Sequence, residues 1–195
     1  MSTRTSAHER YPQLTLDDLD PEQRRVVEPI IDFIGGIVGP FNSTLRSPVI
    51  LERSFLLGQH LLFETTLPRR LVEMAVLIRA RVESSEFEWL SHHHRALEAG
   101  LSEDVCNALR EGRRPEHLAD DEAALFDFSI EAVKRKDVGN ATFDRARERF
   151  GERGVVELTY ILGFYAMIAL VLEVAREGAP DGTPQLPPVE DPFPL

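Results

Sequence analysis

A glutamate and a histidine one helical turn apart are the residues of this sequence best suited to proton transfer. Ser85, Glu88 and His92 are spaced i, i+3 and i+7, which places them on one face of a helix, with Trp89 beside them. A carboxylate four residues before an imidazole can hold one tautomer of the ring and raise its pKa, so that His92 exchanges a proton near neutral pH. The alternative is an ordinary surface pair.

A second carboxylate, Glu73, lies between Val72 and Met74 in a segment that is apolar on almost every side. A carboxylate in such a place either pairs with a cation or has a raised pKa. Arg70, one turn earlier, is the nearest candidate for that cation. Two interpretations stay open: a structural Arg70–Glu73 ion pair, or a carboxylate that acts on a substrate or orients it.

Other kinds of site have weaker support. Glu73, Glu88 and His92 could together bind iron, manganese or zinc, but no second histidine stands at ligand spacing, so we expect no metal ligands and no cofactor. The single cysteine, Cys106, has no partner for a disulfide and no neighbouring histidine to activate it. The glycine motifs of serine hydrolases and of phosphate-binding loops are missing from the sequence.

The segments that must position these residues are predicted to be helices. No stretch alternates as a strand does, so we expect an all-α fold, a single domain of about seven helices. Apolar spacing, caps and terminal glycines predict helices over 21–34, 48–63, from 68 onward, 85–99, 103–111, 120–136 and 140–150, and a long last helix over 151–176. The segment 39–42 is expected to be a loop.

The 195 residues are enough for one domain, over 21–177, with a polar arm at 1–20 before it. The tail at 178–195 holds six of the 13 prolines and cannot continue a helix. For this tail we favour disorder over an arm that packs on a neighbouring subunit.

The formal net charge of −11 disfavours nucleic acid and anionic membrane surfaces as partners, and leaves a small-molecule substrate. The most apolar stretch, 158–172, is shorter than the ~20 residues that cross a bilayer, so it is predicted to be a buried helix. The polar N-terminus and the lone cysteine indicate a cytoplasmic protein.

Several motifs together resemble one family. They are Phe41-Asn42 with Leu45-Arg46-Ser47-Pro48, Leu67-Pro68-Arg69-Arg70 before Glu73, the run from Glu86 to His92 followed by Ala96 and Gly100, and Gly163-Phe164-Tyr165 in the last helix. This combination resembles the carboxymuconolactone decarboxylase family, which is related to the AhpD-like alkylhydroperoxidases. The resemblance implies an all-helical, cofactor-free fold that assembles into a homotrimer or homohexamer.

The resemblance also separates two chemistries. The peroxidase branch carries a Cys-x-x-Cys pair at the positions of Ser85 and Glu88, so this chain lacks both thiols and we expect no thiol peroxidase activity. The decarboxylase branch keeps a glutamate four residues before the histidine, as Glu88 stands before His92.

The decarboxylase resemblance implies a role for each candidate residue. His92 donates a proton, Glu88 orients it, and Glu73 is a positioning group or a second acid or base. Arg46 or Arg70 binds a substrate carboxylate, and Ser85 and Trp89 line the substrate site. The expected substrate is a small carboxylated lactone or a metabolite of aromatic catabolism. The alternative is a non-catalytic oligomeric protein with the same fold that binds a small molecule or acts as a scaffold.

Overall fold

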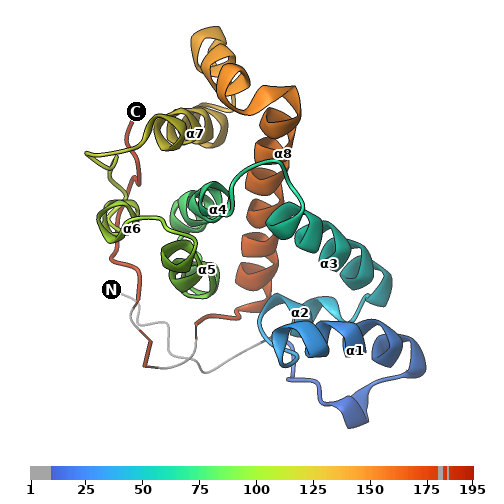
Figure 1. Ribbon diagram of the computed structural model, residues 1–195. Helices are drawn as coiled ribbons and strands as arrows, with labels where there is room; N and C mark the ends of the chain where they lie inside the picture. Colours follow the sequence, from blue (N-terminus) through green and yellow to red (C-terminus); the bar gives the residue numbers. More distant parts are fainter. Residues whose placement is uncertain (1–9, 180–181, 184) are drawn as a thin grey trace.

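The structure is a computed structural model that describes residues 10–179, 182–183 and 185–195. Within these residues it has eight α-helices and no strand, so the all-α prediction is confirmed (Figure 1). A 3₁₀ turn, Leu16–Asp18, precedes α1, and a π-helical turn, Glu131–Arg135, follows α7. The helices are α1 (Pro21–Ile34), α2 (Pro40–Thr44), α3 (Pro48–Phe63), α4 (Arg69–Glu83), α5 (Glu86–Glu98), α6 (Glu103–Arg110), α7 (Asp120–Ile130) and α8 (Asn140–Ala175).

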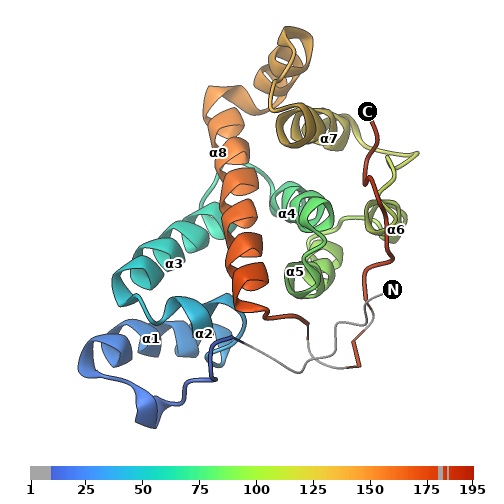
Figure 2. The same cartoon turned by 180° about the vertical axis from the view of Figure 1, so that it is seen from behind.

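Helix α4 lies at the centre of the main core, with α5, α6, α7 and α8 around it (Figures 1 and 2). Its side chains are buried on every side from Leu71 to Ile78, because the helix has no polar face to present to water. Glu73 lies inside this stretch and is completely buried. The central position of α4 therefore takes a carboxylate into the core.

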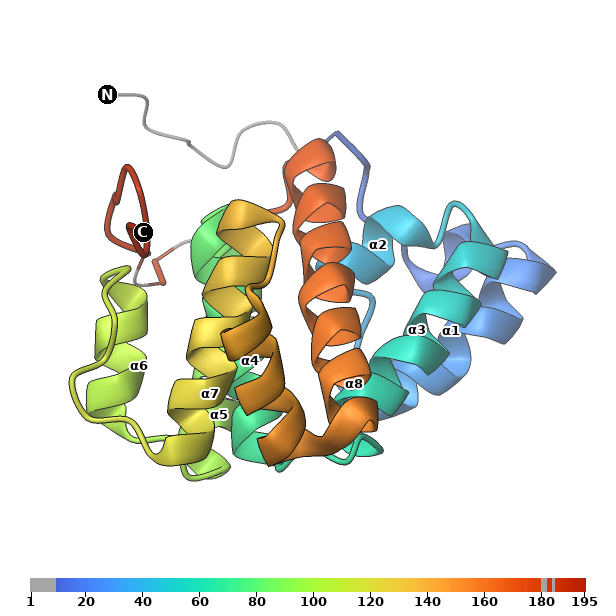
Figure 3. The ribbon, with the colours of Figure 1, turned by 90° about the horizontal axis from the view of Figure 1, so that it is seen from above.

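A smaller core joins α1, α2 and the start of α3 at one end of the molecule (Figure 3). It is built on apolar residues such as Val27, Ile30 and Leu45. Asp20 caps α1 as predicted, since its side chain accepts a hydrogen bond from the Gln23 amide at 2.8 Å. The helix ends at Gly35, whose φ of 93° is left-handed.

One predicted boundary differs from the structure, and another is confirmed. The segment 39–42 was predicted to be a loop, which is wrong, because Pro40 opens the short helix α2 at its first position. The predicted boundary between residues 150 and 151 is confirmed as a kink in α8, because Gly151 has a non-helical φ of 70° and ψ of 170°, with helix on both sides of it. The kink is visible where α8 changes direction in Figure 1.

The N-terminal arm is docked from residue 10 onward, whereas residues 1–9 lie outside the described part of the chain. The Arg10 amide donates to the Ala175 carbonyl at 3.1 Å. The Leu14 amide donates to Asn42 Oδ1 at 3.0 Å. The arm thus ties the end of α8 to α2.

The prediction of a disordered C-terminal tail is wrong for residues 185–195. Phe193 is 2% exposed, and its ring meets the edge of Phe126 on α7 at a centroid distance of 5.6 Å. Its amide donates to the Gly112 carbonyl at 2.7 Å. Arg110 on α6 donates to the Gln185 carbonyl at 2.9 Å. The tail packs on its own chain because proline prevents a helix but leaves apolar side chains free to fill a groove.

The stretch 158–172 belongs to α8, and only one face of it is buried. Among the described residues, α8 alone is long and apolar enough to cross a membrane, and 44% of its most apolar window is buried. The other face carries Val156, Tyr160, Met167, Leu170 and Val174, all exposed. We call this set the α8 outer face.

Candidate active site

A buried hydrogen bond joins α4 to α5 at the centre of the candidate site. His92 Nδ1 lies 2.7 Å from Glu73 Oε2, and both side chains are buried. The expectation that Glu88 orients the histidine is therefore wrong: Glu73, from the neighbouring helix, holds the ring. A spacing of four residues puts two side chains on one helical face, but contacts between helices decide which of their atoms meet.

Arg69 supplies the positive charge beside Glu73. Its Nη2 lies 2.5 Å from Glu73 Oε1. Its Nη1 donates to the Leu62 carbonyl at 2.6 Å, and its guanidinium lies over the Phe63 ring at 4.3 Å. The sequence contained the relevant signal, since Arg69 stands four residues before Glu73 on the same helix.

The predicted Arg70–Glu73 ion pair is wrong. Arg70 instead pairs with Asp121 at 2.6 Å and with Glu122 at 3.2 Å, both on α7. Successive residues of a helix point about 100° apart, so Arg70 faces α7 while Arg69 faces the carboxylate.

Electrostatics favour a charged Glu73 and a neutral His92. Burial alone would raise the pKa of Glu73, but the hydrogen bond to His92 and the charge of Arg69 outweigh it and hold the pKa below its ordinary value. Burial lowers the pKa of His92 more than the Glu73 carboxylate raises it. A neutral imidazole with its proton on Nδ1, donated to Glu73, has a free lone pair on Nε2.

Glu88 has a different environment. It is 2% exposed, and neither carboxyl oxygen has a hydrogen-bond partner of good geometry in the described chain. Burial raises its pKa to about 8, against a smaller opposing effect of the Ser85 hydroxyl. The carboxyl group is therefore mostly protonated at neutral pH. Ser85, at the N-cap of α5, is its polar neighbour.

Tyr165, on α8, packs against His92 and was not predicted as a site residue. Its ring meets the edge of His92 at a centroid distance of 5.0 Å. Burial raises its pKa, and the charges of Glu73 and Glu88 raise it further. The only hint in the sequence was a phenol within an apolar helix, which must find a polar neighbour when buried.

Two other predicted site residues lie in structural contacts. Trp89 is buried and stacks on His93 at 5.8 Å. Arg46 donates to the Asn42 carbonyl at 2.5 Å and to the Pro12 carbonyl at 2.6 Å, so it holds the N-terminal arm in place. Among the described residues, no contact links Arg46 to the Glu73–His92 pair.

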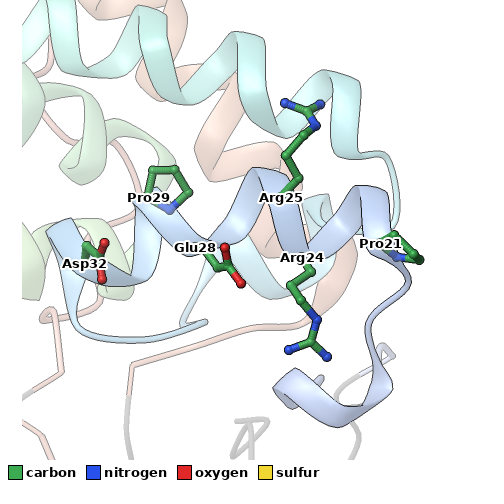
Figure 4. Close-up of a pocket in the computed structure, with 6 residues that line it drawn as sticks. All are labelled: Pro21, Arg24, Arg25, Glu28, Pro29 and Asp32. Atoms are coloured by element: carbon green, nitrogen blue, oxygen red, sulfur yellow. The ribbon is translucent and has the colours of Figure 1, made fainter.

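A hollow of about 260 Å³ opens beside Arg69, lined also by Leu62, Phe63, Thr65 and Leu67. Arg69 connects this hollow to Glu73. A larger hollow, of about 510 Å³, lies along α1 and is lined by the charged side chains and the two prolines labelled in Figure 4. That hollow contains none of the predicted site residues.

Within the described chain, no three His, Cys, Asp or Glu side chains gather closely enough to hold a metal ion. Cys106 is buried, and burial raises the pKa of its thiol to about 11. A thiol that holds its proton so firmly is a poor nucleophile.

Comparison with known proteins places the fold. No protein-family model and no curated protein sequence matches the chain. A solved structure does match, at 18% sequence identity and a TM-score of 0.74, over 88% of this chain and 92% of the other. It is the crystal structure of an alkylhydroperoxidase AhpD core, an uncharacterised peroxidase-related protein from Ralstonia eutropha JMP134. The chain therefore has an AhpD-like, all-helical fold.

Proposed function

We propose that this chain is a cofactor-independent enzyme that transfers a proton to a small carboxylated substrate, in a decarboxylation of the lyase type. The observation that carries this proposal is Glu88, a buried carboxyl group for which neither oxygen has a hydrogen bond of good geometry within the described residues. Leaving such a group unsatisfied lowers stability, so it is a natural candidate for a functional acid. Its pKa of about 8 keeps the proton available at neutral pH.

In this proposal the substrate carboxylate is drawn to the positive charge of Arg69, at the edge of the 260 Å³ hollow. The carbon–carboxylate bond breaks, carbon dioxide leaves, and the electron pair moves onto the conjugated system of the substrate. Glu88 then gives its proton to the resulting carbanion and is reprotonated from solvent. The decarboxylase-like reaction is in this way balanced without an external oxidant or reductant.

This assignment exchanges the roles that the sequence suggested for Glu88 and His92. A neutral His92 accepts a hydrogen bond or a proton at Nε2, while Glu73 fixes the tautomer from the other side of the ring. His92 is thus the better base and Glu88 the better acid, because burial moves their two pKa values in opposite directions.

The similar solved structure is described as peroxidase-related, but the residues of this chain favour different chemistry. The two positions at which the resemblance expects thiols hold Ser85 and Glu88. The one cysteine, Cys106, is buried with a raised pKa. Neither a reactive thiolate nor a resolving thiol is available for a disulfide cycle.

A non-catalytic binding or scaffold protein is the second candidate function. The observation in its favour is the continuous series of contacts from Arg69 through Glu73 to His92, because such a series can also serve to stabilise the fold. A structural network predicts loss of stability on mutation with no activity to lose.

The test is a screen of γ-carboxymuconolactone and of carboxylated lactones from aromatic catabolism, with carbon dioxide release as the readout. Glu88→Gln and His92→Gln should each lower turnover by about 100-fold or more, the size typical of acid or base removal. Glu98→Gln and His94→Gln, at exposed positions of the same helix, are the matched controls. Full turnover by a folded Glu88→Gln protein would refute the acid role, and no turnover on any substrate would favour the binding protein.

We also propose that the chain assembles into a homotrimer or homohexamer through the α8 outer face. Together with Gly163, its residues are spaced by alternating steps of four and three, as at the contact seam of a coiled coil. Three of them, Val156, Tyr160 and Leu170, are each more than half exposed. Monomeric proteins rarely expose so continuous an apolar stripe. A second copy of the chain carries the same stripe, so the stripes of two copies can pack against each other.

A further inference from the structure

Arg81, near the end of α4, is a buried cation with no ion-pair partner among the residues that the structure describes. It is 1% exposed, and its Nε and Nη1 atoms are shielded from solvent without a hydrogen-bond acceptor. In the described chain no carboxylate forms an ion pair with it. A buried guanidinium is strongly destabilising unless an acceptor compensates it. The fold has thus buried a set of donors that its own side chains do not satisfy.

Two further basic side chains belong to the part of the fold where α4, α5 and α6 pack against one another. Arg110, on α6, carries a charge that lowers the pKa of both Arg81 and His93, in addition to the larger effect of burial on each. His93, on α5, has its Nε2 atom buried without a partner. The nearest acidic influence on His93 is Glu103, at the exposed start of α6. Unsatisfied nitrogen atoms from two helices therefore surround a region of positive potential.

The C-terminal tail covers this side of the molecule. Arg110 donates through Nη2 to the Gln185 carbonyl at 2.9 Å. The tail runs beside α6 in both views of the fold (Figures 1 and 2). Arg110 is thereby held in place against the tail.

We propose that Arg81, Arg110 and His93 form a binding site for a small oxyanion, a carboxylate or a phosphate group, between α4, α5 and α6. A planar guanidinium matches the oxygen spacing of both groups and binds either through paired hydrogen bonds. This site uses none of Glu73, Glu88 and His92. The site binds an oxyanion whether or not the chain is a decarboxylase.

The test measures thermal unfolding with added sodium phosphate or sodium acetate, against sodium chloride at equal ionic strength. At tenfold excess over Kd, a bound anion should raise the Tm of the wild-type protein by about 3 to 6 °C. Arg81→Met should abolish this shift, and in chloride alone it should unfold at the same temperature as the wild type or higher, because it removes an uncompensated charge. Arg113→Met, at an exposed position after α6, removes the same charge and should keep the full shift.

Arg110→Gln gives an independent measurement, since Arg110 is only partly buried. It should weaken phosphate or acetate binding severalfold in titration calorimetry. The proposal is overturned if neither anion raises the Tm of the wild type, or if Arg81→Met shows the same shift. It is also overturned if Arg81→Met changes only the oligomeric state, since a carboxylate of a second copy would then be the partner.

Discussion

Glu73, Glu88 and His92 are all buried, and their different neighbours give them different protonation states. Glu73 has a cation and a ring N–H beside it, so it stays ionised in the core. For Glu88, burial outweighs the opposing effects of the Ser85 hydroxyl and the Arg79 charge, so the carboxyl group keeps its proton. His92 is neutral because desolvation outweighs the nearby carboxylate. The same physical effect thus supplies an acid and a base at one site.

The raised pKa of Glu88 predicts a pH dependence of stability. Its folded-state pKa of about 8 exceeds the ordinary value of 4.5, so the folded protein binds the proton more tightly than the unfolded chain does. The stabilisation that comes from this tighter proton binding at Glu88 is fully present below pH 4.5, and it is lost as the pH rises through 8. Relative to Glu88→Gln, the wild type should lose up to about 5 kcal/mol between pH 5 and pH 9.

Urea unfolding at a series of pH values measures this difference. Glu98→Gln, exposed on the same helix, should show a nearly constant difference from the wild type. A constant difference for Glu88→Gln as well would mean that Glu88 is ionised in the folded protein, and the proposed acid would be lost.

Arg69 should contribute more to stability than Arg70. Arg69→Met leaves the fully buried Glu73 carboxylate with His92 as its remaining partner, and should cost about 2 to 3 kcal/mol. Arg70→Met breaks partly exposed ion pairs with α7 and should cost about 1 kcal/mol or less. Denaturant unfolding of the two variants compares them directly, and equal losses would contradict the assignment of Arg69 to Glu73.

At the scale of the elements, helix ends and the two chain termini fix how α2, α5 and the tail are placed. Gly39, before α2, has φ of 54°, and an added Cβ atom would lie 2.1 Å from the Phe87 ring on α5. The close approach of this glycine to an aromatic ring sets the distance between the two cores. Phe193 fixes the tail in a comparable way, by filling a groove beside α7.

Gly39→Ala should destabilise the protein by about 2 to 4 kcal/mol, because both the backbone conformation and the ring contact oppose a side chain. Gly35→Ala is the matched control: its φ is also positive, at 93°, but nothing lies within 4 Å of the added atom. Its cost should be about 1 kcal/mol. Thermal unfolding separates the two effects, and equal losses would show that Phe87 moves aside freely.

Phe193→Ala should cost about 3 kcal/mol, since it removes a buried ring from its contact with Phe126. It should also make the tail sensitive to limited proteolysis. Leu195→Ala, at a position that is 64% exposed, should change neither property. An unchanged protein after Phe193→Ala would mean that the tail does not pack on α6 and α7 in solution.

At the scale of the whole molecule, the α8 outer face is an exposed apolar stripe that the proposed assembly would cover. A self-complementary stripe favours a second copy of this chain, and the acidic net charge disfavours an anionic membrane surface. Assembly through α8 would also rigidify the helix that carries Tyr165 into the candidate site.

Leu170→Glu and Met167→Glu should each convert the oligomer into a monomer, because a charge would be buried in an apolar contact. Light scattering coupled to size exclusion measures the mass. Leu16→Glu adds the same charge at an exposed position far along the chain and should leave the mass unchanged. A monomeric wild type, or one that sediments with lipid vesicles, would overturn the proposed assembly.

The sequence by itself determined most of the helices and several of their limits. Helix caps act through hydrogen bonds within a few residues, so they can be predicted without knowledge of the fold. Examples are Asp20 at the start of α1, Gly35 at its end and Ser102 before α6. The sequence also indicated that Glu73 is buried, because the other residues from Leu71 to Ile78 are all apolar and leave no polar face there. The short helix α2 was missed because a single turn opened by proline has no periodicity to detect.

Only the tertiary structure decided which polar groups meet. Glu73 rather than Glu88 holds His92, Arg69 rather than Arg70 faces Glu73, and Tyr165 arrives from a helix more than 70 residues away in the chain. Helical spacing fixes the face on which a side chain lies, but the rotation and separation of packed helices fix its partner. The solvation of a carboxyl group is also decided by the tertiary structure. Its pKa depends on everything that surrounds it in three dimensions, and neighbours along the chain supply only part of that environment.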